Sequence, residues 1–161
     1  WVELGLQTIH ERTARYIRRG YDLPVFETAV SELRRRGIDV IVHTILCLPG
    51  ETKPDMLQTI QYLNRQDIQG IKLQLLHILK DTDLAEIYAS DPLPVPDPQE
   101  YYELLGACIS HLRPDIVIHR LTGDGPKELL IAPLWTCNKR QVLNQLQSYF
   151  KTHDIWQGKE Y

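Results

Sequence analysis

Residues 38–52 read Ile-Asp-Val-Ile-Val-His-Thr-Ile-Leu-Cys-Leu-Pro-Gly-Glu-Thr, and this stretch decides the fold. The part up to Leu48 is a continuous apolar run rich in β-branched residues, which is typical of a parallel strand buried on both faces. Pro49-Gly50 then ends the run in a turn. Thr52 and Pro54 follow as start signals of a helix. The stretch therefore predicts a strand, a turn and a helix in immediate succession.

The same order of strand and helix recurs on both sides of this stretch. The pattern predicts further strands at residues 1–6, 70–78 and 116–121, and helices at residues 10–19, 24–36, 52–65, 81–89, 101–112 and 140–150. Strands that alternate with helices favour an α/β fold with parallel strands and right-handed crossovers. Residues 91–98 contain four prolines and are expected to form an extended connector.

The composition is that of one compact globular unit and excludes several classes of protein. Of the 161 residues, 43% are hydrophobic and 24% are charged, and the net charge of −3 gives no global attraction to nucleic acid or to an anionic membrane. No apolar run approaches the roughly 18 residues of a membrane helix, so we expect a cytoplasmic protein with no membrane partner. Trp1 opens directly on a predicted buried strand, and we therefore expect the chain to be a piece of a longer protein.

The three cysteines are expected to be independent thiols. Cys47, Cys108 and Cys137 lie far apart in the sequence and lack the close pairs of zinc sites or disulfide scaffolds. We predict no metal site in this chain and expect Cys108 to be a core residue of its helix.

Polar residues of the first strand are the first candidates for a binding site. Alternation along the strand puts Glu3, Gly5 and Gln7 on one face, and in a curved sheet that face points inward. A buried carboxylate there needs a partner. Glu3 is therefore expected either to bind an amine of a ligand or to pair with an interior Lys or Arg.

Three motifs in the right order resemble those of radical S-adenosylmethionine (SAM) enzymes. Glu3-Leu4-Gly5-Leu6-Gln7-Thr8, with Arg19-Gly20-Tyr21 twelve residues after Gln7, is similar to their fourth strand. Residues 43–52 resemble their fifth strand, which ends in a Gly-Leu-Pro-Gly-Glu-Thr turn, although Cys47 replaces the first glycine. Lys80-Asp81-Thr82-Asp83-Leu84 resembles the end of their sixth strand. The nearest groups are the oxygen-independent coproporphyrinogen oxidases and the Elongator catalytic subunits, and residues 119–133 resemble an Elongator-like branch.

This resemblance implies a fold and a chemistry. The fold would be a partial (β/α) TIM-like barrel with parallel strands and outer helices, formed by residues 1–90, and a small α+β C-terminal extension, residues 91–161. The cofactors would be SAM and a [4Fe-4S] cluster, whose three-cysteine loop does not occur in this sequence. The intact enzyme would cleave SAM reductively to a 5'-deoxyadenosyl radical for hydrogen abstraction, with tRNA base modification as the expected use and flavodoxin or ferredoxin as electron donor. The fragment alone would be inactive.

The resemblance also assigns residues to SAM, while no catalytic side chain is predicted. Gln7 would contact the ribose, Arg19 the carboxylate, His43 the region near the ribose, Glu3 the amine, and Leu48, Pro49 and Gly50 the adenine. Ordinary structural roles remain open for two of them: Arg19 as a cation at a helix end and His43 as a core histidine.

The substrate side is expected near the open end of the barrel. His77, Lys80, His119 and Arg120 would gather there if their strands adjoin. The turn at residues 122–126 would present backbone amides to a phosphate, or would simply be a turn that needs its glycines.

A binding module of another class is the alternative to an enzyme fragment. Its basis is a set of arginines on predicted helices, which would form a surface for RNA or for a protein partner: Arg12, Arg15, Arg18, Arg34, Arg35 and Arg36. Solvation of helix surfaces explains most of these residues equally well. A nicotinamide-dependent oxidoreductase is excluded because no Gly-x-Gly-x-x-Gly motif follows a strand.

Overall fold

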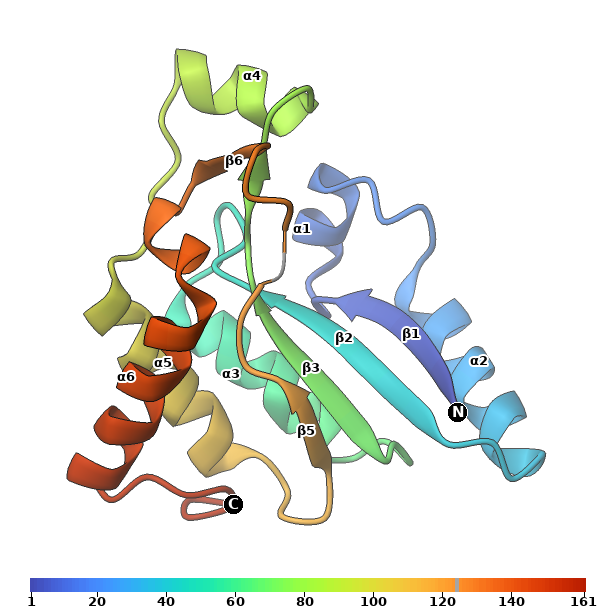
Figure 1. Cartoon of the computed structure of the whole chain (residues 1–161). Coiled ribbons are helices and arrows are strands. Elements are labelled where there is room, and N and C mark those ends of the chain that lie inside the picture. The colour runs from blue at the N-terminus through green and yellow to red at the C-terminus, as the bar shows by residue number, and fades with distance from the viewer. Residues whose placement is uncertain (124) are drawn as a thin grey trace.

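A computed structural model describes residues 1–123 and 125–161. The elements in chain order are β1 (Val2–Gln7), α1 (Glu11–Tyr16), α2 (Leu23–Arg35), β2 (Val40–Leu46), α3 (Lys53–Leu63), β3 (Gly70–Leu75), β4 (Ile78–Leu79), α4 (Asp83–Ser90), α5 (Pro98–His111), β5 (Val117–Arg120), β6 (Leu130–Ala132), the 3-10 helix η1 (Leu134–Cys137) and α6 (Lys139–Thr152) (Figure 1). The predicted α/β class with parallel strands and outer helices is confirmed.

The main sheet has four parallel strands in the order β1-β2-β3-β5. Strand β2 lies within the apolar run at residues 38–48 and has a neighbouring strand on each edge. Its core-facing residues are buried, but His43 and Ile45 on the other face are partly exposed, so the prediction of burial on both faces holds fully for one face only. Strand β5 belongs to the part of the chain after residue 90. The main sheet therefore continues past residue 90, and the division of the chain into two domains at that residue stays a prediction.

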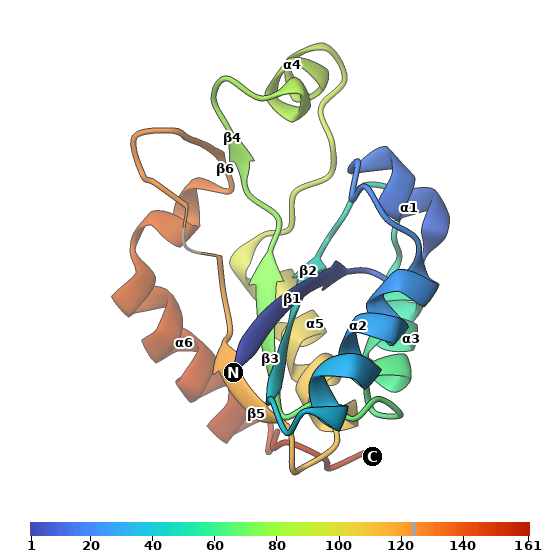
Figure 2. The same ribbon diagram turned by 90° about the vertical axis from the view of Figure 1, so that its right-hand side faces the viewer.

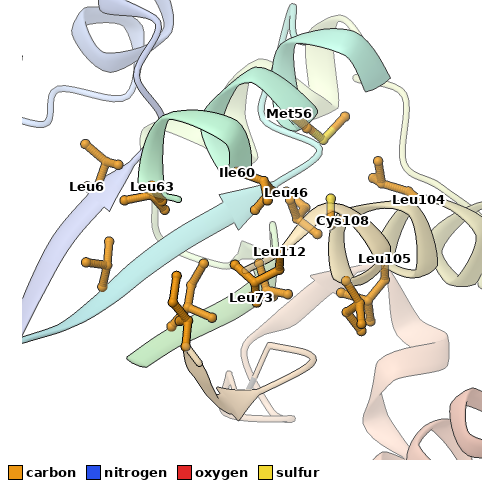
Figure 3. Close-up of a cluster of buried hydrophobic side chains, with 14 of the residues drawn as sticks. Leu6, Leu46, Met56, Ile60, Leu63, Leu73, Leu104, Leu105, Cys108 and Leu112 are labelled. Atoms are coloured by element: carbon orange, nitrogen blue, oxygen red, sulfur yellow. The ribbon is translucent and has the colours of Figure 1, made fainter. Parts of the chain in front are cut away.

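One face of the sheet carries the hydrophobic core. Alternate residues of the strands, such as Val42, Leu46 and Leu73, pack against α2, α3 and α5, and α6 packs on α5 (Figures 1 and 3). Cys108 of α5 is fully buried among these side chains, so its predicted core role is confirmed. The opposite face, called the open face below, carries Glu3 and its neighbours, and no helix of the described residues covers it (Figure 1).

The helix starts follow from capping signals. Thr52 and Asp55 form a capping box at the start of α3, and Asp97 and Glu100 form another at the start of α5. The second box explains why α5 starts at Pro98, three residues before the predicted start, because proline fits the first helical turn.

The region after β3 differs from the prediction. The predicted strand at residues 70–78 ends at Leu75, and Ile78–Leu79 forms the separate strand β4. This strand pairs antiparallel with β6, a strand that was not predicted. The turn predicted at residues 122–126 includes Asp124, which lies outside the described residues.

Helix α4 projects away from α2, α3 and α5 (Figure 2). It contains no buried residue. The connector that follows it, called the strap (residues 91–97), has no regular structure, and Trp135 Nε1 donates to the carbonyl of Pro96 at 3.0 Å. Within the described ranges, we find no helix that has the length and apolar character needed to cross a membrane.

Candidate functional site

A pocket of about 770 Å³ lies at the carboxyl edge of β1, β2 and β3, where parallel sheets bind ligands. We call it the rim pocket. Its lining residues come from β1, from α1 and the turn after it, from β2 and the turn after it, from the residue after β3, and from Thr82 and the start of α4: Gly5, Gln7, Tyr16, Ile17, Arg18, Arg19, Tyr21, Ile45, Leu48, Leu76, Thr82, Asp83, Leu84 and Ile87. The structure therefore brings together three of the predicted SAM contacts, namely Gln7, Arg19 and Leu48.

Gln7 enters this pocket from a strained turn. Its φ is +58°, and the N–H of Thr8 donates to the carbonyl of Leu6 at 2.8 Å, which closes a three-residue γ-turn around Gln7. A non-glycine residue in this conformation costs about 1–3 kcal/mol and persists only where surrounding contacts fix it. With its nitrogen facing the backbone, the Gln7 amide donates to the carbonyls of Leu6 (3.1 Å) and Gly5 (3.0 Å). The amide oxygen is then the atom left to accept a bond from a ligand hydroxyl.

Arg19 fixes the turn around Gln7 through hydrogen bonds to the backbone. Its side chain is 1% exposed. The guanidinium donates to the carbonyls of Tyr21 (2.8 Å), Leu6 (3.2 Å) and Thr8 (2.8 Å) and to Glu11 Oε1 (3.0 Å). Its bonds therefore go mainly to the backbone on both sides of Gln7, while a contact with the SAM carboxylate stays a prediction.

Glu3, His43 and Lys72 form a polar network on the open face, outside the rim pocket. Lys72 Nζ lies 2.7 Å from both carboxylate oxygens of Glu3, and His43 Nε2 lies 2.7 Å from Glu3 Oε2. Gln74 Nε2 lies 3.1 Å from His43 Nδ1. The bonds with Lys72 and then His43 lower the pKa of Glu3 to about 2. Pairing with an interior lysine, one of the two expectations for Glu3, is thus what the structure shows.

A second pocket, of about 340 Å³, lies under the strap. The β2–α3 turn, α3, α5, the segment after β3 and the strap itself line it: Cys47, Leu48, Pro49, Gly50, Glu51, Lys53, Met56, Leu76, Ile78, Leu93, Pro94, Val95, Pro96, Glu100, Glu103 and Leu104. Pro49 and Gly50, which were predicted to contact adenine, line this pocket and not the rim pocket. Leu48 and Leu76 line both, so they form the wall between the two.

Cys47 occupies a backbone conformation that favours glycine, with φ of +62°. The positive φ explains why the resembling Gly-Leu-Pro-Gly-Glu-Thr turn has a glycine at the position of Cys47. Burial raises the pKa of the Cys47 thiol to about 12, and the charges of Glu100 and Glu51 add to the shift. The free thiol is therefore expected to be protonated at neutral pH.

The structure does not bring the four predicted substrate-side residues together. The ring of His119 lies over Gly70 at the start of β3, because a Cβ added to Gly70 would be 2.7 Å from it. His77 lies beyond the other end of β3, against the glycines at 123 and 125. Arg120 pairs with Lys72 in the strand register, and Lys80 is exposed after β4. The parallel register with β5 puts His119 beside the amino half of β3, away from His77, and a substrate role for the four residues stays a prediction.

Several arginines of the proposed RNA surface are paired with acids. Arg34 lies 2.8 Å from Asp39 and 3.2 Å from Asp67, and both Arg35 and Arg36 contact Glu32. Arg18 pairs with Asp83 of α4 at 2.5 Å. These contacts reduce the positive field of that surface, and RNA or protein binding stays a prediction.

The sequence did not single out Tyr16, Tyr21 or residues 82–87 as site residues. The available signals were the Arg-Gly-Tyr motif for Tyr21 and the Lys-Asp-Thr-Asp-Leu motif for residues 82–84, and neither motif was given a role for these residues. Tyr21 is placed by its hydroxyl, which donates to the carbonyl of Gly5. Among the described residues no group of three or more His, Cys, Asp or Glu is arranged to hold a metal.

Comparisons with known proteins agree with this geometry. Residues 1–63 match the family model of the radical SAM superfamily, and residues 68–152 match that of the radical SAM C-terminal domain. YtqA of Bacillus subtilis is 40% identical over 99% of this chain and 49% of its own length, and YhcC of Escherichia coli K12 is 34% identical over 96% and 50%. The chain thus spans about half the length of these relatives. Elongator complex protein 3 of Schizosaccharomyces pombe is 23% identical over 91% of this chain and 28% of its own length.

A solved structure shares the fold. Elp3 of the archaeon Methanocaldococcus infernus, with an N-terminal deletion, superposes with a TM-score of 0.82 at 16% identity, over 97% of this chain and 37% of that one. The four-stranded sheet, the helices on one face and the two family matches lead to one conclusion: the chain belongs to the radical SAM superfamily.

Proposed function

We propose that the chain supplies the SAM-side wall of a radical SAM enzyme that acts on a nucleic-acid base, with tRNA as the substrate. The observation that supports this most is the rim pocket, which lies at the carboxyl edge of a parallel sheet in a chain of this superfamily. The substrate class follows from the resemblance to Elongator catalytic subunits. The resemblance also favours a small electron-transfer protein, such as flavodoxin or ferredoxin, as the electron donor.

The residues of the rim pocket fit the chemistry of SAM. Ile45 and Leu48 offer apolar surface to an adenine ring and exclude water from it, and the amide oxygen of Gln7 accepts a bond from a ribose hydroxyl. The volume of about 770 Å³ lies in the range of small-molecule sites. When bound, SAM together with a reduced [4Fe-4S] cluster supplies a 5'-deoxyadenosyl radical that takes a hydrogen atom from the substrate.

The cluster itself does not fit the described part of the chain. Cys108 is fully buried in α5, Cys47 lines the pocket under the strap, and Cys137 lies in η1. Their positions in three separate elements form no three-cysteine site. We therefore assign the cluster to residues of the intact protein outside this chain.

The test uses the full-length protein, reconstituted without oxygen and reduced with dithionite. It is expected to convert SAM to 5'-deoxyadenosine, measured by liquid chromatography and mass spectrometry. Gln7→Ala is expected to weaken SAM binding about fivefold, because it removes one hydrogen bond worth about 1 kcal/mol. Gln61→Ala, at an exposed position of α3, is the matched control.

Two results would count against the proposal. A reconstituted protein that forms no 5'-deoxyadenosine refutes the radical SAM activity. Equal SAM affinity of Gln7→Ala and Gln61→Ala refutes the assignment of the rim pocket. The nucleic-acid substrate is tested separately, by comparing modified nucleosides in tRNA from cells with and without the gene.

A further inference from the structure

Helix α1 has an exposed face that carries two arginines and a tyrosine. Arg12, Arg15 and Tyr16 are exposed and stand at the helical spacing i, i+3 and i+4, while the buried residues of the helix lie on its other side. Arg18, just after the helix, is exposed as well. We call these four residues the α1 surface. Helices α1 and α4 lie beyond the carboxyl ends of β1 and β2 (Figures 1 and 2), and both Tyr16 and Arg18 line the rim pocket.

Two arginines of the α1 surface keep most of their donors unused. Arg15 makes no hydrogen bond or ion pair with the described residues, although its charge acts on the carboxylate of Glu11. Arg12 uses one N–H, which donates to the carbonyl of Gly50 at 3.2 Å. A guanidinium has five N–H donors in a fixed planar arrangement that matches the oxygens of a phosphate. The α1 surface therefore offers positive charge together with directed donors.

Arg18 is paired, but with a partner that an anion can replace. Its Nη1 lies 2.5 Å from Oδ2 of Asp83 at the start of α4, and the two side chains are 78% and 64% exposed. Ion pairs that are this exposed are weak, because water and salt screen them. The pair also shows that the guanidinium of Arg18 reaches an anionic oxygen at the edge of the rim pocket.

Tyr16 adds an aromatic ring at the same place. It is 46% exposed and makes no ring contact with the described residues. The other tyrosine of the rim pocket, Tyr21, already has partners within the fold. Its hydroxyl donates to the carbonyl of Gly5, and the guanidinium of Arg19 lies 5.0 Å from its ring centroid. Tyr16 is thus the tyrosine of this pocket whose ring stays open to a ligand.

An exposed ring between arginines matches single-stranded RNA. Proteins hold single strands with cationic side chains that follow the phosphates and with aromatic rings on which the bases stack. An enzyme that acts on a base needs that base outside the stack, where a ring replaces the lost neighbours. An acidic protein segment would satisfy the arginines and would leave Tyr16 without a stacking partner.

We infer that the α1 surface holds the RNA substrate beside the rim pocket. Arg12 and Arg15 bind backbone phosphates of a single-stranded segment, and Arg18 exchanges Asp83 for a further phosphate. The ring of Tyr16 stacks on the base next to the pocket. This inference rests on the proposed function, in which tRNA is the substrate, and it names the residues that hold that substrate.

The test measures binding of an unmodified tRNA transcript to the full-length protein by fluorescence anisotropy at several salt concentrations. Each phosphate contact on a single strand contributes about 0.7 to the slope of log affinity against log salt concentration. Arg15→Ala is therefore expected to reduce this slope by about 0.7, and the double variant with Arg12→Ala by about 1.4. The affinity lost in Arg15→Ala is expected to shrink about 2.6-fold between about 50 and 200 mM salt, as a slope of 0.7 requires.

Tyr16 is tested by a change that leaves the charge unaltered. Tyr16→Ala is expected to weaken tRNA binding about 5- to 150-fold with an unchanged salt slope, because stacking on a base releases no counterion. Tyr16→Phe keeps the ring and is expected to stay within about twofold of wild type. With a fully paired RNA duplex, Tyr16→Ala is expected to have no effect, because the bases stay stacked on each other.

Two controls separate RNA binding from folding and from SAM chemistry. Arg35→Ala is the matched charge control, because Arg35 is 66% exposed on α2 and pairs with Glu32. It is expected to bind tRNA within about twofold of wild type. Formation of 5'-deoxyadenosine without RNA shows that a variant keeps its SAM site, and Arg15→Ala is expected to equal wild type in this assay, since Arg15 does not line the rim pocket.

The possible outcomes decide between the occupants. A wild-type salt slope in Arg15→Ala, or wild-type affinity in Tyr16→Ala, overturns the inference. Displacement of tRNA by polyglutamate at equal charge, with no effect of Tyr16→Ala, assigns the surface to an acidic protein segment instead. A wild-type protein that forms 5'-deoxyadenosine but binds no tRNA refutes the inference and leaves the radical SAM chemistry standing. A protein that binds tRNA through these residues but forms no 5'-deoxyadenosine supports the α1 surface and refutes the proposed chemistry.

Discussion

Replacing Arg19 by methionine tests whether this residue braces the β1 turn. The side chain is 1% exposed and donates to three carbonyls and to Glu11. Methionine fills a similar volume and donates nothing. At about 1 kcal/mol for each of the bonds, the loss amounts to roughly 4 kcal/mol of unfolding free energy.

Equilibrium urea unfolding of the Arg19→Met variant, followed by tryptophan fluorescence, measures this loss. The control is Arg35→Met, because Arg35 is 66% exposed and pairs with Glu32 on the surface. Exposed pairs of this kind contribute about 0–1 kcal/mol. If Arg19→Met costs no more than the control, the guanidinium does not brace the turn and the reasoning is refuted. If the unfolding free energy falls by the predicted amount, the SAM affinity of Arg19 variants must be calculated from the folded fraction of each variant.

Two further predictions concern ionisable groups. The folded-state pKa of Glu3 is about 2, below its ordinary value of 4.5, so its contribution to stability is complete above pH 4.5 and is lost as the pH falls toward 2. The difference in unfolding free energy between wild type and Glu3→Gln is therefore expected to be constant from pH 7 to 5 and to shrink below pH 4.5. A difference that increases as the pH is lowered would contradict this. Burial raises the thiol pKa of Cys47 and Cys108 to about 12, so both are expected to resist iodoacetamide at pH 8 in the folded protein, while Cys137 is labelled first. Mass spectrometry of the peptides measures the order, and rapid labelling of Cys108 would disprove it.

The alternation of strands and helices was predictable because its signals are local. The β-branched run up to Leu48 and the capping residues Thr52 and Pro54 act within a few positions of where they stand. The pairing of β4 with β6 was not predictable, because strands of two and three residues give no periodic signal and meet across a long stretch of sequence.

The candidate site was predictable only in part, for a similar reason. Gln7 ends β1 and Leu48 follows β2, and parallel strands bring such residues to one edge. Three of the four partners of Arg19 are backbone carbonyls, which the sequence does not distinguish from other carbonyls. The place of His119 depends on the direction and register of β5. These depend on tertiary pairing, which no local pattern of residues contains.

Helix α4 forms one wall of the rim pocket, and this wall can be displaced at little cost in free energy. It contributes Leu84 and Ile87 to the pocket but buries none of its residues, and its ion pair with Arg18 is exposed to solvent. Moving it outward therefore breaks little apolar contact and leaves the sheet unchanged. The pocket thus combines a rigid floor, set by the strands, with one side whose displacement costs little free energy. We therefore expect a ligand wider than this pocket to displace α4 before it disturbs the turn at Gln7.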